Sequence, residues 1–297
     1  MAIPLNLRAL AFALAALVAP AAEALERGPL DAFAAPWSAL GRVNAGGRGY
    51  CSGVLVGRAT VLTAAHCVYD FRNRRWWPAA DISFVAGYLR DAWVATAKAK
   101  RVVRDKDLKL VDRHPELAAV PADWALIELE SPIGDRAGWL PLSRTEPPAP
   151  GALVLQAGYR RDRPHAPELL PPCRMLQAPP GLLFHDCVVP EGGSGSPLLT
   201  VDADGGIVVA GVHSAQVHRT APDGTVNVFS AVVPAESFAW RVPRANPPAI
   251  PEGSLRRALL SLDGERRRLS QASLETLIRE LYLSRDRNSE KSAAETK

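Results

Sequence analysis

Short apolar runs separated by Gly, Pro and Asp dominate the chain between residues 37 and 240. The runs lie at residues 38–44, 50–56, 60–64, 82–87, 94–97, 124–129, 152–157, 196–201, 207–212 and 226–233. Runs of this length, with turn residues between them, predict the strands of an all-β barrel or sandwich. Ala203-Asp204-Gly205-Gly206, between two of the runs, is typical of a β-hairpin. The chain shows no βα alternation and no fixed-period repeat, so we predict an all-β fold.

The pattern changes near Trp240. Residues 241–253 contain several prolines and few apolar positions, which predicts a linker. Residues 254–284 carry apolar side chains at helical spacing and predict a short C-terminal helical appendage, with Ser270 or Ser273 as an N-cap of its second helix. Two short helices bury little surface alone, so we expect them to dock on the barrels. Residues 285–297 are polar and are predicted to be disordered.

The N-terminus has the pattern of an export signal. Arg8 is followed by an apolar stretch at residues 9–19, a helix-breaking Pro20 and the small-residue site Ala22-Glu23-Ala24. We therefore predict a signal peptide at residues 1–24, an irregular lead-in at 25–36, and a periplasmic or extracellular protein. A retained anchor is the alternative, although the apolar stretch is short for a bilayer.

Four cysteines in an exported chain indicate two disulfides, for which three pairings are open. We favour Cys51–Cys67, because the strands around them are expected to be antiparallel neighbours. That choice leaves Cys173–Cys187, which closes a loop leading toward residue 194. A zinc site is the competing interpretation, but the chain has no paired CxxC spacing.

Three segments carry candidate chemistry. Thr63-Ala64-Ala65-His66-Cys67 places a histidine directly after an apolar run, Asp123 opens the apolar run at 124–129, and Gly192-Gly193-Ser194-Gly195-Ser196-Pro197 frames a serine with glycines. A serine hydroxyl is a weak nucleophile without a neighbouring base, and an imidazole that serves as base needs an acid to orient it. We therefore predict Ser194 as nucleophile, His66 as general base and Asp123 as orienting acid. Ser196, Asp107 and Asp112 are weaker candidates.

The flanking glycines allow a tight turn, and the N–H groups of Gly192 and Ser194 are predicted to form an oxyanion hole. Metal and organic cofactors have no support. The histidines other than His66 and His213 are scattered through the sequence and have no helical i, i+4 spacing; they are His114, His165, His185 and His218.

The net charge of +4 is small for 297 residues. The basic residues do form local clusters, listed as Arg72, Arg74, Arg75, Lys98, Lys100, Arg101, Arg104, Lys106 and Lys109. No aromatic-interleaved or nucleic-acid motif accompanies them, so we predict a solvated loop face and no nucleic-acid partner.

Together, the His66, Asp123 and Ser194 segments resemble those of the chymotrypsin-like (trypsin-like) serine peptidases, in the bacterial branch that includes glutamyl endopeptidases. The resemblance covers residues 37–240. It implies two six-stranded antiparallel β-barrels with the active site in the cleft between them, and an exported serine endopeptidase that acts on proteins or peptides through an acyl-enzyme. His66 and Asp123 are expected in the first barrel, and Ser194 in the second.

Two departures from the family pattern affect activation and specificity. Animal members carry an acid immediately before the nucleophile, where this chain has Gly193, so activation by an amine–carboxylate switch is not expected. The primary-pocket aspartate of trypsin-like enzymes corresponds to Val188, although the neighbouring Asp186 keeps basic specificity open. The segment around His213 resembles the acid-reading segment of glutamyl endopeptidases, which implies a substrate-binding role for His213. Ser214 is expected on the substrate-pairing strand and as a support for Asp123.

Two other functions are compatible with the pattern. One is a catalytically silent binding protein on the same fold, and the other is a serine esterase acting on small esters. The chain order His, Asp, Ser argues against the common esterase fold. The sequence does not determine the natural substrate or the oligomeric state.

Overall fold

The computed structural model describes residues 28–47, 49–110, 116–170, 172–202 and 206–244. The predicted signal peptide, the helical appendage, the polar tail and most of the predicted linker lie outside these residues. Among the described residues, no helix is long and apolar enough to cross a membrane.

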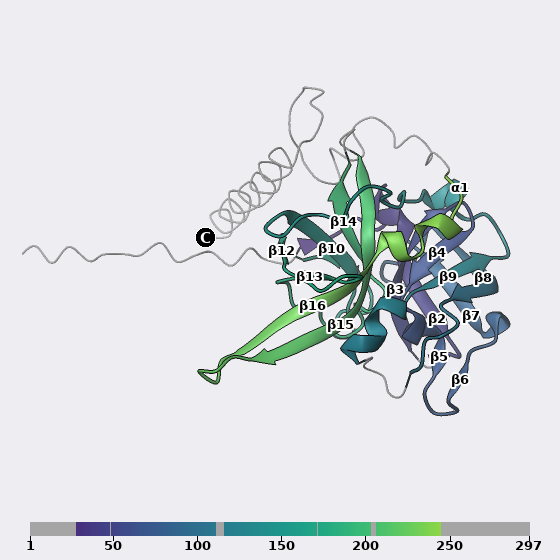
Figure 1. The fold of residues 1–297 in the computed structure, drawn as a ribbon. Coiled ribbons are helices and arrows are strands. Elements are labelled where there is room, and N and C mark those ends of the chain that lie inside the picture. Colours follow the sequence, from purple (N-terminus) through teal and green to yellow (C-terminus); the bar gives the residue numbers. More distant parts are fainter. Residues whose placement is uncertain (1–27, 48, 111–115, 171, 203–205, 245–297) are drawn as a thin grey trace, which may run out of the picture.

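The N-terminal half of the described chain forms a closed antiparallel barrel (Figure 1). Its strand order is β2-β3-β4-β9-β8-β7. The strands are β2 (Leu40–Ala45), β3 (Tyr50–Gly57), β4 (Thr60–Thr63), β7 (Ile82–Ala86), β8 (Ala95–Arg104) and β9 (Ala125–Leu129). In β7 buried and partly exposed residues alternate, as expected for a strand with one face on the core.

The C-terminal half forms a second closed ring in the order β10-β12-β13-β16-β15-β14, with the β10–β14 pairing closing it. The strands are β10 (Leu153–Tyr159), β12 (Cys173–Leu176), β13 (Leu183–His185), β14 (Pro197–Val201), β15 (Ile207–Thr220) and β16 (Val226–Pro234). Two six-stranded antiparallel barrels were predicted, and the structure confirms them.

The remaining elements are short and mostly connect or cover the barrels. They are β1 (Gly28–Pro29), η1 (Trp37–Ala39), η2 (Ala65–Val68), β5 (Tyr69–Asp70), β6 (Arg75–Trp76), η3 (Ala79–Asp81), η4 (Leu117–Ala122), α1 (Gly134–Ala137), β11 (Pro167–Leu169), η5 (Ala235–Ser237) and η6 (Ala239–Arg241). One large apolar cluster draws residues from both barrels, so the barrels share a core.

The predicted lead-in at residues 25–36 is not wholly irregular. β1 pairs with β11 at the edge of the second barrel, and Leu30 and Ala32 are buried. The strands β11, β12 and β13 were not predicted. Each has only three or four residues, too few to establish a periodic pattern, and each depends on pairing with a longer neighbour.

The predicted loop face of basic residues is also corrected. Lys98, Lys100, Arg101 and Arg104 lie on β8, a strand that runs on to Arg104 because β9 pairs with it to that point. The Arg101 side chain bonds Glu128, and the Arg104 guanidinium stacks 3.6 Å from the centre of the Trp76 ring. This polar segment is therefore a barrel strand because it pairs with β9.

Candidate active site

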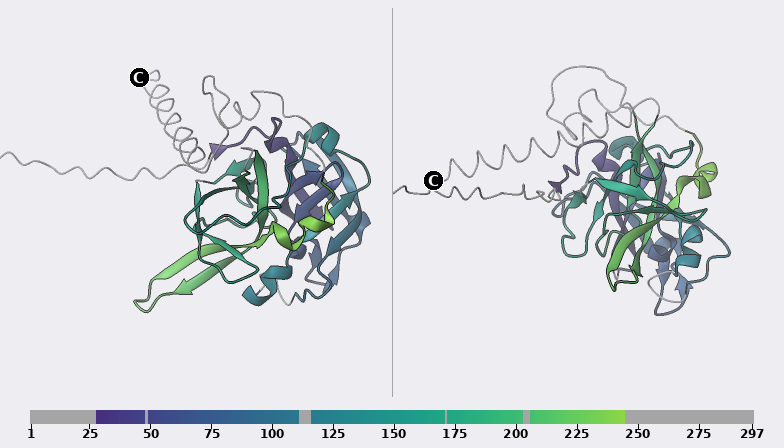
Figure 2. Two further views of the ribbon diagram at one scale, coloured as in Figure 1. Left: turned by 45° about the horizontal axis from the view of Figure 1, so that its top comes forward. Right: turned by 60° about the vertical axis from the view of Figure 1, so that its left-hand side comes forward.

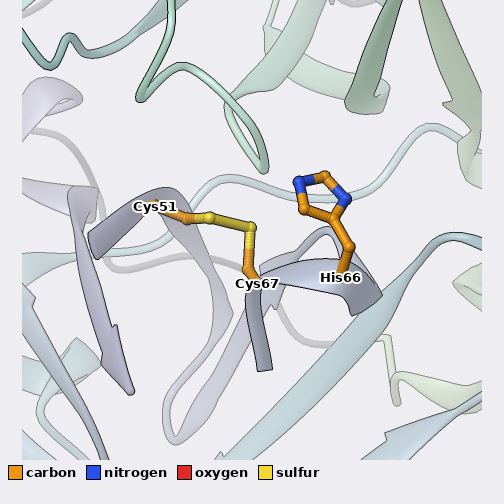
Figure 3. A group of neighbouring side chains, drawn as sticks. All are labelled: Cys51, His66 and Cys67. Carbon is orange, nitrogen blue, oxygen red and sulfur yellow. A yellow bond between two sulfur atoms is a disulfide. The ribbon is translucent and has the colours of Figure 1, made fainter. Parts of the chain in front are cut away.

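His66 lies in η2, directly after β4 of the first barrel. Ala64 and Ala65 before it are fully buried, so small side chains let this turn pack closely. The next residue, Cys67, forms a disulfide with Cys51 on β3, which ties the turn to the neighbouring strand (Figure 3). The backbone of His66 is thus fixed on both sides.

Asp123 holds the imidazole of His66. It ends η4 and is fully buried. Its carboxylate accepts the backbone N–H of His66 at 2.8 Å and contacts the His66 Nδ1 at 2.7 Å. The Ser214 hydroxyl donates to the same carboxylate at 2.5 Å. An Nδ1–H that donates to a carboxylate leaves Nε2 as the acceptor of a neutral imidazole.

Ser194 lies in the loop before β14 and connects to both barrels through the backbone. Ser52 N–H on β3 donates to the Ser194 carbonyl at 2.9 Å, and the Gly195 N–H donates to the His213 carbonyl at 2.9 Å. Gly195 has a φ of +79°, and a Cβ there would lie 2.2 Å from the Thr63 Oγ1. Only glycine fits this position, because the loop passes against the strand that leads to His66.

Two N–H groups at this loop are free. The Glu191 carbonyl accepts the Arg161 N–H at 2.7 Å, and the Gly193 carbonyl accepts the Ser196 N–H at 3.0 Å. In a trans peptide the C=O and the following N–H point in opposite directions. The N–H groups of Gly192 and Ser194 therefore point away from those contacts, and neither has a hydrogen-bond partner among the described residues.

A second loop fixes the Glu191 carbonyl. Arg160 pairs with the buried Glu168 at 2.8 Å, and the Tyr50 hydroxyl donates to the Arg160 carbonyl at 2.5 Å. These contacts hold the backbone around Arg161. The Arg161 N–H then fixes the orientation of the Glu191–Gly192 peptide by its hydrogen bond to the Glu191 carbonyl. A phenol is protonated at neutral pH at its ordinary pKa, and burial raises the pKa of Tyr50 further, so the hydroxyl remains a donor.

An open cleft of about 260 Å³ brings His66 and Ser194 together. The Cys51–Cys67 disulfide, Gly192 and residues from both barrels line it. The other lining residues are Ala45, Gly49, Tyr50, Tyr69, Asp70, Phe71, Arg72, Trp77, Arg161 and Glu191. Most of these come from loops, where the sequence shows no periodic pattern that could have identified them.

Ser52 is another residue that the sequence reasoning missed. Its side chain is 1 % exposed and links the two barrels. The hydroxyl oxygen accepts a hydrogen bond from the Tyr159 N–H at 2.8 Å, and the hydroxyl donates to the Gly192 carbonyl at 3.2 Å. It therefore sets the distance between β3 and the loop that carries Ser194.

The residues expected to contact substrate are not gathered in this cleft. Val188 is 43 % exposed and does not line the cleft, so it is not at the base of a buried pocket. Asp186 accepts the Arg174 N–H at 2.7 Å and is held against β12. Ser214 is buried behind Asp123.

His213 is buried on β15, next to a second buried histidine. Desolvation, together with the nearby His185 and His66, holds the pKa of His213 well below its ordinary value. Burial also lowers the pKa of His185 to about 4. The Nδ1 of His213 and both ring nitrogens of His185 have no hydrogen-bond partner among the described residues. Both histidines are therefore neutral near pH 7.

The position before Ser194 cannot carry a side chain. A Cβ on Gly193 would lie 2.3 Å from the Val189 Cγ1 and 2.9 Å from the Pro190 carbonyl oxygen.

The predicted pairs Cys51–Cys67 and Cys173–Cys187 are both present as disulfides. In the described part of the chain, two groups have the spacing of metal ligands, and each consists of one disulfide and one histidine. Sulfurs joined in a disulfide are not thiolate ligands, so these groups do not fit a metal.

Comparison with known proteins agrees with this geometry. The trypsin family model matches residues 29–171, a range that includes His66 and Asp123 and ends before Ser194. A solved structure of a Glu endopeptidase in complex with MPD aligns with a TM-score of 0.56 and 20 % identity, covering 72 % of this chain and 95 % of that chain. No curated protein matches the sequence.

Proposed function

We propose that this protein, which is a chymotrypsin-like serine endopeptidase by its trypsin-family domain and its two-barrel fold, uses Ser194 as nucleophile, His66 as general base and Asp123 as orienting acid. The main support is that Asp123 binds His66 through two hydrogen bonds, while His66 and Ser194 line the same cleft.

In the proposed acylation, the Ser194 Oγ bonds to the carbonyl carbon of the scissile peptide and its proton passes to the His66 Nε2. The buried Asp123 carboxylate stabilises the imidazolium that forms. His66 then gives the proton to the leaving nitrogen as the C–N bond breaks. In deacylation, water loses a proton to His66 and its oxygen bonds to the acyl carbon. His66 then returns the proton to the Ser194 Oγ as the ester C–O bond breaks, which releases the acid product and free Ser194.

The free N–H groups of Gly192 and Ser194 are proposed to bind the oxyanion of each tetrahedral intermediate. Donors that are already oriented cost no reorganisation during the reaction, and one such donor contributes about 3 kcal/mol. The Arg161 N–H that holds the Glu191 carbonyl supports this orientation before substrate arrives.

Export to the periplasm or the medium is part of the proposal. It is supported by the two disulfides, which persist in oxidising compartments, and by the signal pattern of residues 1–24. We further propose that no buried amine–carboxylate pair switches the enzyme on, because Gly193 offers no carboxylate and no room for one.

For the residue before the scissile bond, we propose acid recognition by His213. Its Nδ1 has no partner among the described residues, and a neutral imidazole donates a hydrogen bond to a carboxylate. The side chain is 3 % exposed, so contact with substrate requires the side chains over it to move. Cleavage of a peptide library mainly after Asp or Glu supports this role, and cleavage mainly after Lys or Arg overturns it.

The triad is tested by labelling purified residues 25–297 with a fluorophosphonate probe beside Ser194→Ala. Peptide mass spectrometry is expected to find the adduct on Ser194 and none in the variant. Ser196→Ala is the matched control, because Ser196 is a serine of the same loop and is expected to keep labelling. Absence of an adduct on folded, disulfide-intact protein overturns the proposed mechanism. Cleavage of a denatured protein beside an aryl ester separates peptidase from esterase activity.

A further inference from the structure

The strands β15 and β16 continue beyond the second barrel as a two-stranded arm. β13 pairs with β16 only as far as Ser230, whereas β15 and β16 stay paired to Thr220 and Val226. Figures 1 and 2 show this arm projecting from the body. His218, Arg219 and Thr220 are exposed on it.

One edge of β15 is occupied only in part. β14 pairs along it up to Val212, and His213 exchanges backbone hydrogen bonds with Gly195 and Ser196. Beyond His213, no strand in the described chain pairs with this edge. Residues 214–220 contain no proline, so each of them keeps a backbone N–H.

The free edge begins beside the nucleophile. Ser194 directly precedes Gly195, the residue that bonds His213 at the end of the occupied edge. The Gln216 side chain at the base of the arm also bonds the Val189 carbonyl, which ties the arm to the loop before Ser194. An extended peptide on the free edge therefore has one end beside the loop that carries Ser194.

The polarity of β15 decides which part of the substrate lies there. β14 and β16 are both antiparallel to β15, and a peptide that continues the line of β14 has the same direction. Such a peptide runs from Thr220 toward Ser214, so its C-terminal end reaches Ser194. The residues on the arm are then those that precede the scissile carbonyl.

We propose that the arm is an extended substrate-binding strand, which pairs by β-augmentation with about six residues before the scissile bond. Substrate pairing near Ser214 is already implied by the resemblance to the serine peptidases, and this inference rests on the proposed function. The addition is that β15 continues the same edge through residues 217–220.

The first experiment varies substrate length on the two sides of the bond. A short cleaved peptide from a library is extended on its N-terminal side from three to six residues, and separately on its C-terminal side. N-terminal extension is expected to raise kcat/KM about tenfold, the effect of one or two net hydrogen bonds. An equal kcat/KM for three and six N-terminal residues overturns the inference.

The second experiment shortens the arm. An Asn-Gly turn replaces residues 218–228, joining Val217 to Phe229, which are opposite each other in the ladder. The variant is expected to lose the gain from N-terminal extension while keeping fluorophosphonate labelling and cleavage of the short peptide. Val226→Thr is the matched control, because it changes an exposed residue of the other strand, β16.

A scan of the substrate keeps the test independent of the folding of that variant. Single N-methylation along the six-residue peptide is expected to lower kcat/KM of the wild type at alternate positions, as in an antiparallel ladder. If N-methylation lowers kcat/KM at no position, or lowers it equally at all positions, the proposed role of the arm is overturned. Absence of both labelling and short-peptide cleavage overturns the proposed function as well, whereas normal labelling with flat length dependence overturns the arm alone.

Discussion

At the scale of single residues, the buried Asp123 carboxylate has three donors around it, which are the His66 N–H, the His66 Nδ1–H and the Ser214 hydroxyl. An amide in place of this carboxylate carries no negative charge to stabilise an imidazolium. Its NH₂ group can also donate to the His66 Nδ1, the nitrogen that has to act as a donor here. The carboxyl group therefore both orients His66 and stabilises its protonated form.

Asp123→Asn is expected to lower kcat/KM by about four orders of magnitude, the size known for the general Ser-His-Asp template. The measurement is steady-state cleavage of a library-selected peptide at pH 7. Asp107→Asn is the matched control, since Asp107 is exposed and the same atoms change. A loss below tenfold for Asp123→Asn contradicts the assigned role.

The Gly192 backbone is the second feature at this scale. Its φ is +92°, and a Cβ there would lie 2.6 Å from the Arg161 N. We expect Gly192→Ala to lower kcat by about 100-fold or more, because turning this peptide removes an oxyanion donor.

Gly151→Ala separates that effect from general backbone strain. Gly151 has a φ of +86° and open space around the built Cβ, so the substitution pays a left-handed backbone penalty of about 1 kcal/mol without touching the cleft. We expect reduced unfolding free energy in both variants and reduced kcat only in Gly192→Ala. Equal kcat values contradict the oxyanion assignment.

At the scale of elements, the two disulfides close loops of similar length. Cys51–Cys67 spans 16 positions and Cys173–Cys187 spans 14. Chain entropy alone therefore predicts nearly equal stabilisation, about 3 kcal/mol each. Their positions differ, because the first lines the cleft beside His66 and the second joins β12 to the segment after β13.

Replacing each pair by alanines is expected to lower the unfolding free energy by similar amounts, measured by urea denaturation. Only loss of Cys51–Cys67 is expected to reduce kcat/KM of the folded fraction by about tenfold, since η2 then loses its tie to β3 and near-attack geometry is sensitive to small displacements. The Cys173, Cys187 double variant is the control, and unchanged activity in both contradicts a positioning role for the first disulfide.

At the scale of the whole molecule, the two buried histidines make folding stability depend on pH. The pKa of His185 is about 4 in the folded state, against an ordinary value of 6.5. Between these values the unfolded chain binds more protons, so stability falls as the pH falls. The full effect for His185 is about 3 kcal/mol, and the lowered pKa of His213 acts in the same direction.

His185→Leu is expected to flatten the fall in unfolding free energy between pH 6.5 and 4, measured by urea denaturation at several pH values. His218→Gln is the control, because His218 is exposed on the arm and its loss is expected to leave the slope unchanged. An unaltered slope in His185→Leu contradicts the assignment of the proton uptake to this residue.

The sequence by itself determined the all-β class, favoured the two disulfide pairs that the structure has, and singled out His66, Asp123 and Ser194 as the proposed triad. These features are encoded locally, in apolar runs between turn residues and in short segments around each functional side chain. The order of the three segments along the chain also indicated the family. That order can be read from the sequence without knowing any distance between the residues.

The tertiary structure alone decided what depends on partners distant in sequence. β8 continues through its basic residues because β9 pairs with it, and β11 to β13 exist because longer strands offer them edges. The wall of the cleft comes from Tyr50 at the start of β3 and from Trp77 and Arg161 on separate loops, and no local pattern predicts that these residues meet. The free edge of β15 likewise follows from where β14 begins, which only the paired strands reveal.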